Sequence, residues 1–421
     1  MARVMGEAGD VAVDELVEKG RVHRRLYVDP LVFEKEMERI YYGGWVFVCH
    51  ESEISEPGDY KTSYIGRQPV ILSRHSNGQI YVLLNRCMHR GAQVCQEGKG
   101  NTRAFRCLYH GWAYDNKGDL LVVPFPEGYG EDFDTSKLGL RAAPCVESYR
   151  GFVFASLNPD VGALRECMGP AADVIDLIVD AAPGGEIEVG AGVQKYVYYG
   201  NWKLQIENWV DGYHPSFTHQ SAFALMARKT GAKPSSQQGS VAKAVSIPNG
   251  HALLDFTGSP RAALPSGDGD AEYQAALESR YGRERAREVR ESDVQILVFP
   301  NLFIQSNGQH FRVVRPISVD KTEVHAYPYA LKGGSEEQNR RMASRLGWWA
   351  SAAGFGQPDD LEAFERCQEG LRIESAEWLL FSRGLHREQR RADGSVVGDV
   401  TDEVTQRGIY EEWKARMTDG R

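Results

Sequence analysis

The 421-residue sequence lacks several features that would assign it to a common class of protein. No run of 18 apolar residues occurs, so a membrane-spanning helix is not expected. No Lys/Arg-rich run occurs, and 58 acidic residues outnumber 49 basic ones, which argues against a nucleic-acid partner. The first twenty residues lack the apolar centre of a secretion signal. We therefore expect an intracellular, cytoplasmic protein that does not bind membranes.

Two further absences concern disulfide bonds and a nicotinamide cofactor. The seven cysteines are an odd number in a long chain without an export signal, which does not suit a disulfide framework. No Gly-x-Gly-x-x-Gly motif opens a βαβ unit, so a Rossmann-type nicotinamide site is not expected. Any electrons from NADH would have to arrive through a separate protein.

The residue pattern divides the chain into three parts. Residues 1–40 are charged, and two stretches there are of helical type: 14–25 and 29–42. From 41 to 160, short β-branched and aromatic runs alternate with Gly, Pro, Asn and Asp, which predicts a small antiparallel β domain. Residues 161–421 mix helical and strand-like runs, with long loops expected over 230–270. This pattern predicts an all-β insert within, or beside, an α+β domain.

The densest group of potential metal ligands lies between residues 87 and 110. Cys87 and His89 are followed, after 17 intervening residues, by Cys107 and His110. Each pair offers one thiolate and one imidazole, which suits either a tetrahedral Cys2His2 zinc or a [2Fe–2S] cluster with two cysteines on one iron and two histidines on the other. Cys-x-His is an unusual opening for a zinc finger, so the cluster is the favoured interpretation.

A second group of potential ligands lies in the segment NWKLQIENWVDGYHPSFTHQ, residues 201–220. Glu207, Asp211 and His214 repeat at helical spacing, which predicts a helix up to His214. Pro215 would interrupt that helix and let His219 turn back toward His214. Two imidazoles and one carboxylate form the facial triad of non-haem Fe(II) oxygenases. The alternative is a pair of ordinary surface histidines near a helix end.

Together these two groups resemble the Rieske non-haem iron oxygenases. Several stretches resemble the large (alpha) subunit of benzoate, toluate and anthranilate 1,2-dioxygenases: YKTSYIGRQPVILSR, ESYRGFVFASLNPDV, NWKLQIENWVDGYH, RVVRPISVDKTEV and QPDDLEAFERCQEG. The resemblance implies an α+β fold in which an all-β Rieske domain is inserted in a helix-grip catalytic domain with an antiparallel sheet. It also implies two cofactors, a [2Fe–2S] cluster on the first group and a mononuclear Fe(II) on His214, His219 and a third ligand.

The third iron ligand is implied by a short motif near the end of the chain. In the family resembled, a Gly-Phe followed by an Asp-Asp pair supplies the carboxylate through the second Asp. Gly354, Phe355, Asp359 and Asp360 match this pattern, so Asp360 is the expected ligand. Asp359 is then expected to cap the helix that follows.

Two residues near His214 have roles implied only by the resemblance. Asp211 matches an aspartate that bridges a cluster histidine of one subunit to an iron histidine of the next, which places it between His110 and His214. Such a bridge implies a ring of three alpha chains. Asn208 matches an asparagine that lines the iron site without a firm bond to the metal.

The resemblance implies the terminal oxygenase of an aromatic degradation enzyme. It would cis-dihydroxylate a carboxylated aromatic ring with O2 and with NADH electrons from a separate flavin or iron–sulfur reductase, directly or through a ferredoxin. A small β subunit is expected, in an α3 or α3β3 assembly. Arg312 is a candidate for binding the substrate carboxylate. Candidates for the pocket lining are Trp209, Phe217, Phe223, Phe303 and Gln305.

Three alternatives remain open from the sequence. A Rieske monooxygenase that hydroxylates or demethylates a substituted aromatic would use the same metal ligands. A non-catalytic Rieske electron carrier would need only the first group of ligands. A zinc-stabilised binding module would hold zinc in place of the cluster.

Overall fold

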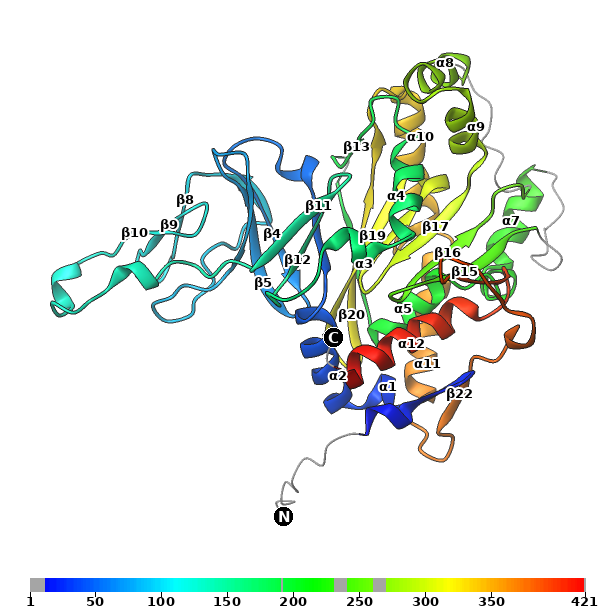
Figure 1. The fold of residues 1–421 in the computed structure, drawn as a ribbon, viewed down its shortest axis with the longest axis horizontal. Helices are drawn as coiled ribbons and strands as arrows, with labels where there is room; N and C mark the ends of the chain where they lie inside the picture. The colour runs from blue at the N-terminus through cyan, green and yellow to red at the C-terminus, as the bar shows by residue number, and fades with distance from the viewer. Residues whose placement is uncertain (1–11, 191, 231–240, 260–269, 420–421) are drawn as a thin grey trace.

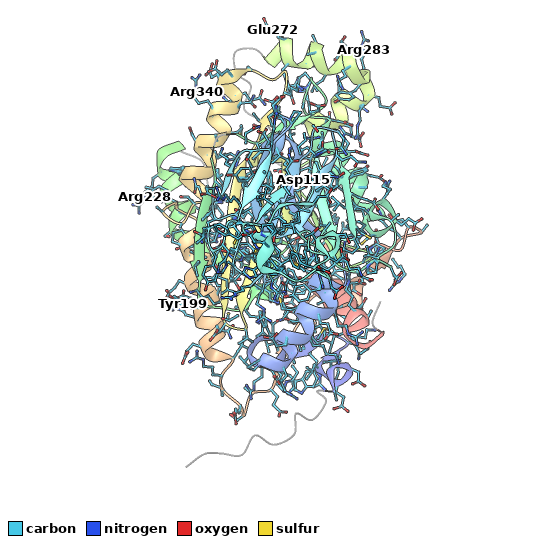
Figure 2. All side chains as sticks on the ribbon, turned by 90° about the vertical axis from the view of Figure 1, so that its left-hand side faces the viewer. Asp115, Tyr199, Arg228, Glu272, Arg283 and Arg340 are labelled. Atoms are coloured by element: carbon cyan, nitrogen blue, oxygen red, sulfur yellow. The ribbon has the colours of Figure 1, made fainter. Side chains whose placement is uncertain are left out.

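The computed structural model describes residues 12–190, 192–230, 241–259 and 270–419. They form a narrow β lobe and a larger lobe that is built on one long sheet (Figure 1). Seen from the end of the β lobe, Asp115 lies toward the viewer, in front of the larger lobe (Figure 2). No helix among the described residues is long and apolar enough to cross a membrane.

The β lobe contains three antiparallel sheets, which confirms the predicted β domain. Their strand orders are β6-β5-β4-β7, β10-β9-β8 and β11-β12-β3. The strands are β3 (Val46–His50), β4 (Asp59–Ile65), β5 (Gln68–Arg74), β6 (Ile80–Leu84), β7 (Lys99–Asn101), β8 (Ala104–Arg106), β9 (Ala113–Asp115), β10 (Leu120–Val122), β11 (Cys145–Tyr149) and β12 (Phe152–Ser156).

The larger lobe is organised by a nine-stranded antiparallel sheet of order β14-β20-β19-β18-β17-β16-β15-β24-β23. Its strands are β14 (Gln194–Tyr198), β15 (Lys243–Ile247), β16 (His251–Asp255), β17 (Val294–Val298), β18 (Leu302–Gln305), β19 (His310–Ser318), β20 (Lys321–Pro328), β23 (Gln389–Arg390) and β24 (Val396–Asp399). Strands β15 and β16 lie inside the segment 230–270, where only loops were predicted. Residues 231–240 and 260–269 of that segment lie outside the described residues.

Two smaller sheets and the helices complete the lobe. The remaining strands are β1 (Val17–Glu18), β2 (Arg21–His23), β22 (Trp378–Leu380), β13 (Ile187–Glu188) and β21 (Ala330–Leu331). The α-helices are α1 (Arg25–Val28), α2 (Pro30–Glu36), α3 (Leu164–Met168), α4 (Ala171–Val179), α5 (Trp202–Trp209), α6 (Pro215–Thr218), α7 (Gln220–Thr230), α8 (Asp270–Tyr281), α9 (Arg283–Glu291), α10 (Glu336–Arg345), α11 (Gln357–Gly370) and α12 (Val404–Asp419). Short 3-10 or π turns occur at Val13–Leu16, Met37–Tyr42, Glu51–Ile54, Pro126–Gly128, Thr135–Lys137, Ser306–Gly308, Leu346–Ala350 and Leu385–Arg387.

The N-terminal segment differs in part from the prediction. The helix expected over 14–25 is wrong: strands β1 and β2 pair there as a hairpin, and β2 also pairs with β22. Gly20 in the turn has φ +76°, a conformation that favours a hairpin over a helix. The helix expected over 29–42 is present as α2 and the π turn that continues it.

The two faces of the long sheet have different neighbours. Helix α4 and the strands β3 and β12 of the β lobe pack on one face, where Phe311 meets Phe47 and Phe152. Helices α5, α11 and α12 pack with the residues of the other face, which includes Phe303 and Val314. Because side chains alternate along a strand, residues one apart on β19 belong to opposite faces. This division separates the two sites described below.

A buried ion pair holds the first turn of α5 in place. Lys203 and Glu36 are both 0% exposed, and Lys203 Nζ lies 2.5 Å from Glu36 Oε1. The indoles of Trp202 and Trp413 donate to the same carboxylate at 2.8 and 2.7 Å. A buried charge is tolerated only when it is paired and hydrogen-bonded, as it is here. The carboxylate of Glu36 thus joins α2, α5 and α12.

Candidate metal centres

The first group of ligands lies on two similar loops of the β lobe. In each loop the glycine amide donates to the cysteine carbonyl, Gly91 to Cys87 and Gly111 to Cys107, both at 3.0 Å. The two glycines have φ of +76° and +75°, where a side chain would be strained. The paired loops place one Cys-His pair opposite the other.

The donor atoms in these loops suit a [2Fe–2S] cluster. Cys87 and Cys107 are each 2% exposed and form no disulfide. The rings of His89 and His110 lie 4.5 Å apart, and the buried Nδ1 of His89 has no hydrogen-bond partner. Burial and then the neighbouring His110 lower the pKa of His89, which favours the neutral imidazole that binds metals. Two buried thiols beside two histidines fit the cluster's ligand set.

Aromatic and hydroxyl groups contact these ligands. His89 stacks on Trp112 with ring centroids 5.0 Å apart and an interplanar angle of 4°. Tyr114 is fully buried, and its hydroxyl lies 3.2 Å from Cys87 Sγ. Hydrogen bonds to the sulfurs are one of the factors that set a cluster's reduction potential.

The second group of ligands depends on the end of α5, which differs from the prediction. The helix ends at Trp209, five residues before His214, so a helix up to His214 is wrong. Side chains of α12 donate to the backbone carbonyls at the end of α5. Thr405 donates to the carbonyl of Val210 at 2.8 Å, and Gln406 donates to the carbonyl of Glu207 at 3.3 Å. These tertiary contacts replace the hydrogen bonds of a further helical turn.

Pro215 has the opposite role to the one predicted. It is the first residue of α6, with His214 immediately before it, so it begins a helix and does not end one. Proline suits a first helical position because its missing N–H would have no partner there. His219 then follows the single turn of α6, and its ring centroid lies 5.5 Å from that of His214.

The three expected iron ligands converge. His219 Nε2 lies 3.2 Å and His214 Nε2 3.6 Å from Asp360 Oδ1. One ligand atom from each residue lies within 4.8 Å of the others. His219 and Asp360 are buried and His214 is partly exposed. Two imidazoles and a carboxylate in this arrangement fit a non-haem iron.

A second carboxylate orients each histidine. Asp211 Oδ2 lies 3.2 Å from Nδ1 of His214, and Asp359 Oδ2 lies 3.3 Å from Nδ1 of His219. Such carboxylate–histidine pairs fix the tautomer and ring orientation of metal ligands. The predicted capping role of Asp359 is wrong, because α11 begins at Gln357 without a side-chain cap.

Asn208 lies between two of the ligands. Its Nδ2 donates to Asp360 Oδ1 at 3.1 Å and lies 3.2 Å from Nε2 of His214. Burial opposes protonation of His219, but hydrogen bonds from its ring to Asp360 and Asp359 outweigh this effect and raise its pKa. The same carboxylates that raise this pKa favour a bound cation.

Comparison with known proteins identifies the family. Residues 44–147 match the family model of the Rieske [2Fe-2S] domain, and residues 188–419 match that of the ring hydroxylating alpha subunit (catalytic domain). The chain belongs to the ring-hydroxylating alpha subunits. As a member of this family, it is an oxidoreductase that dihydroxylates aromatic rings and uses a Rieske [2Fe–2S] cluster together with a mononuclear iron.

Individual relatives of this alpha subunit agree with the family match. It is 36% identical to the 2-halobenzoate 1,2-dioxygenase large subunit of Burkholderia cepacia, over 86% of this chain and 80% of the relative. It is 33% identical to the anthranilate 1,2-dioxygenase large subunit of Acinetobacter baylyi, over 95% and 90% of the two chains. The structure of naphthalene 1,2-dioxygenase from Rhodococcus sp. bound to indole superposes with a TM-score of 0.86 at 29% identity, over 97% and 98%. The predicted fold and enzyme class are confirmed.

The predicted pocket residues of the alpha subunit lie in different places. Trp209 stacks on Phe303 with centroids 5.0 Å apart, on the sheet face that α5 covers. Phe223 stacks on Trp349 near His219. Phe217 is 69% exposed, so the structure does not place it in an enclosed lining.

Three residues of this region were not singled out from the sequence. Trp349 has its ring 5.5 Å from that of His219, and Gln357 and His310 are both buried with unpaired side-chain atoms. Gln357 could have been found from its position, because it lies three residues before Asp360 on the same helix. His310 is two residues from Arg312 on β19, so strand alternation could have placed both on one face.

Proposed function

We propose that this alpha subunit cis-dihydroxylates an aromatic ring that bears a carboxylate, as the terminal oxygenase in the degradation of an aromatic compound. Two relatives are named for their action on such compounds, 2-halobenzoate and anthranilate. The observation on which the proposal rests is a buried arginine, Arg312, near the iron ligands. Among the described residues no carboxylate pairs with it.

Arg312 occupies the sheet face that α5 and α11 cover. It is 6% exposed, and its Nη1 donates to Gln357 Oε1 and lies 3.5 Å from the hydroxyl of Tyr196. The guanidinium carbon lies 4.7 Å from the ring centroid of Trp209, while Nε has no partner. Gln357 is one turn before Asp360 on α11, so both side chains leave the same side of that helix. The guanidinium of Arg312, which contacts Gln357, therefore lies on the side of α11 that carries the iron ligand Asp360.

The neighbourhood of Arg312 contains other buried polar atoms without partners. Neither ring nitrogen of His310 has a hydrogen bond among the described residues, and neither does Nε2 of Gln357. Burial and then the nearby Arg312 lower the pKa of His310 well below its usual value, so its imidazole is neutral. Each unpaired buried group costs about 1–3 kcal/mol, which a hydrogen-bonding ligand would recover. A carboxylate is a ligand that accepts from both guanidinium and imidazole N–H groups.

The residues around the iron site have distinct expected roles. Iron held by His214, His219 and Asp360 would activate O2 for addition to the ring, with electrons from a cluster held by Cys87, His89, Cys107 and His110. Asn208 would position His214 and Asp360 through its amide. Asp211 and Asp359 would hold the two imidazoles in the orientation that leaves Nε2 free to bind metal.

The exposed surface around His110 supports an assembly of several chains. Among the described residues of one chain, Asp211 pairs with the imidazole of His214 and accepts from the amide of Tyr213, and His110 lies exposed on the β lobe. Two apolar neighbours of His110 are also exposed, Leu108 by 73% and Tyr109 by 56%, which is unusual for a surface that stays in water. We infer that His110 of a neighbouring copy pairs with Asp211, in an α3 or α3β3 ring that includes a small β subunit and receives electrons from a separate reductase. The division at residues 40 and 160 stays a prediction, supported by the packing of α12 on Val13–Leu16 and Met37–Tyr42.

Product analysis with ¹⁸O₂ tests the proposed reaction. The alpha subunit, co-expressed with its small subunit and supplied with reductase and NADH, should convert benzoate to a cis-diol acid with two labelled atoms. A phenol with one labelled atom would overturn dihydroxylation in favour of a monooxygenase.

Substitution of Arg312 tests the proposed substrate class. Arg312→Gln should raise KM for benzoate by about 10- to 100-fold, the effect of losing one charge-assisted pair. The rate with toluene, which lacks the carboxylate, should change little. Arg340→Gln, at an arginine whose side chain is 68% exposed on α10, is the control. An equal loss with both substrates would show that Arg312 has a structural role only.

A further inference from the structure

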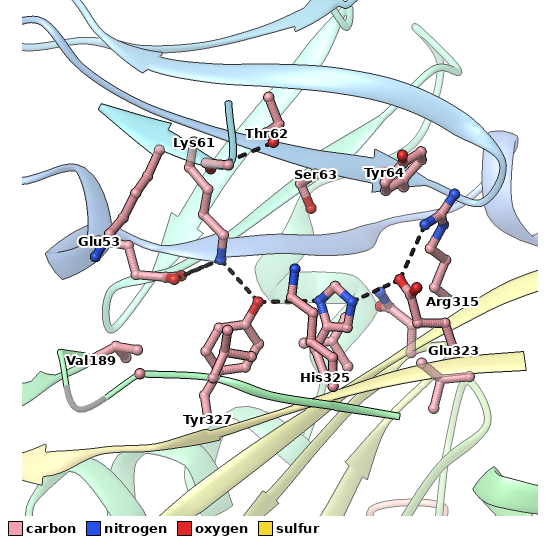
Figure 3. Close-up of a pocket in the computed structure, with 18 of the residues that line it drawn as sticks. Glu53, Lys61, Thr62, Ser63, Tyr64, Val189, Arg315, Glu323, His325 and Tyr327 are labelled. Carbon is pink, nitrogen blue, oxygen red and sulfur yellow. Dashed lines mark hydrogen bonds and ion pairs between the residues drawn. The ribbon is translucent and has the colours of Figure 1, made fainter. Parts of the chain in front are cut away.

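A pocket lies between the β lobe and the long sheet (Figure 3), and none of the iron ligands lines it. It has a volume of about 620 Å³, within the usual range for sites of small ligands. Strand β4 forms one wall, and strands β14, β19 and β20 form the other. We call it the inter-lobe pocket.

The inter-lobe pocket is separate from the iron site because it uses the opposite face of the sheet. Lys195, His325 and Val313 are paired across β14, β20 and β19, so their side chains share one face. Arg312 precedes Val313 on β19 and therefore points to the other face, where the iron ligands lie. A molecule in the inter-lobe pocket cannot be the ring that is oxidised.

A continuous set of polar contacts lines the pocket wall (Figure 3). Lys61 Nζ lies 2.6 Å from Glu53 and 3.2 Å from the hydroxyl of Tyr327, which lies 3.4 Å from His325. His325 lies 2.7 Å from Glu323. Lys61 is thereby neutralised by a carboxylate of its own.

Arg315 and Glu323 form the other end of this set. Arg315 Nη1 donates to Glu323 at 3.1 Å, its guanidinium lies 3.2 Å from the ring centroid of Tyr64, and its Nε is buried without a partner. The hydrogen bond from His325, followed by the charges of His325 and Arg315, lowers the pKa of Glu323 to about 2. The carboxylate of Glu323 is therefore ionised and offsets Arg315.

Two lysines in the pocket have no such compensation. Lys99 lies directly opposite Lys61 on paired strands, and its side chain is exposed. Lys195 lies directly opposite His325. Neither Lys99 nor Lys195 has a carboxylate within 4.0 Å among the residues that the structure describes. With Lys61 and Arg315 offset, the pocket has an excess of two positive charges.

We propose that the inter-lobe pocket binds a small oxyanion, a carboxylate or phosphate compound, between Lys99 of the β lobe and Lys195 of the long sheet. The hydroxyl of Ser63, which points into the pocket in Figure 3, offers a further donor. Such a ligand would offset the excess charge of Lys99 and Lys195. It would also join the two lobes, because its two lysine partners belong to different lobes.

Calorimetric titration of the holoenzyme tests the proposal. Succinate and inorganic phosphate are used in separate titrations, because both are oxyanions but one is a carboxylate and the other a phosphate. At least one of them should bind saturably and raise the thermal midpoint. Lys195→Gln and Lys99→Gln should each weaken that binding by about tenfold, the loss of one charge-assisted contact.

Two controls distinguish this site from others. Lys137→Gln, at a lysine whose side chain is 87% exposed on the β lobe, should leave binding unchanged. Arg312→Gln should also leave it unchanged, because Arg312 is on the other sheet face. Absence of saturable binding by both probes, or an affinity in Lys195→Gln and Lys99→Gln equal to that of the wild type, would overturn the proposal. A loss of oligomeric state in Lys195→Gln without any binding of the probes would likewise overturn it, in favour of an acidic segment of a neighbouring chain.

Discussion

The two metal centres of this protein are built in opposite ways. The cluster ligands all lie within residues 87–110, on two loops whose turns are set by local hydrogen bonds. The iron ligands are His214 and His219, on either side of α6, and Asp360 of α11, and they converge because α11 packs against both α5 and α6. A local site depends on its own loops, whereas a site assembled from distant elements depends on the whole lobe. Substitutions should therefore affect one centre without the other.

The largest effect is expected from Asp360→Ala. Loss of the carboxylate removes one of three iron ligands, so mononuclear iron and turnover should both fall to background. Metal analysis together with the visible and EPR spectra should show an intact cluster. Glu362→Ala, at a side chain that is 61% exposed on the same helix, serves as the control. Loss of the cluster signal as well would contradict the independence of the two centres.

Asp211→Ala should separate metal content from electron transfer. Both centres should stay filled, while turnover should fall by about 100-fold because the link between them is lost. Rapid mixing of the pre-reduced protein with substrate and O2 would measure reoxidation of the cluster. Asp173→Ala, at a side chain that is 74% exposed, controls for charge. Normal turnover in Asp211→Ala would exclude its bridging role.

A smaller effect is expected from Asp359→Ala. The carboxylate only orients His219, so iron affinity should fall by about tenfold while the cluster is unchanged. Asp359→Asn retains one acceptor oxygen and should recover most of the affinity. Competition with an iron chelator provides the measurement, and equal affinities in Asp359→Ala and the wild type would rule out this positioning role.

The smallest effect is expected at the cluster, from Tyr114→Phe. A hydrogen bond from the hydroxyl to the Cys87 thiolate stabilises the reduced, more negative cluster. Its loss should lower the reduction potential by about 50 mV, which corresponds to about 1 kcal/mol for one electron. Tyr81→Phe, at a partly exposed tyrosine of the same lobe, should leave the potential unchanged. A spectroelectrochemical titration that gave equal potentials for Tyr114→Phe and the wild type would show that this hydrogen bond has no effect on the cluster.

The same contrast explains what the sequence could predict. The cluster ligands, the β lobe, His214, His219 and Asp360 follow from short spacings and from a family motif. The end of α5 at Trp209 does not, because the partners of its last carbonyls, Thr405 and Gln406, are almost 200 residues away in sequence. Likewise, the orienting role of Asp359 depends on how α11 packs beside His219. Local patterns identify ligands, but tertiary packing determines which neighbours support them.

Helix α5 is held in place by residues of α12, which is the last helix of the chain to be synthesised. Trp413 of α12 shares the carboxylate of Glu36 with the first turn of α5. The start of α5 requires the indole of Trp413, and its end requires Thr405 and Gln406, all of which are synthesised after every metal ligand. On the ribosome, the β lobe has its complete set of cluster ligands long before these partners emerge. The order of synthesis therefore favours a chain that acquires its electron-transfer centre before its oxygen-activating centre, so that iron which could react with O2 is bound only in a nearly finished protein.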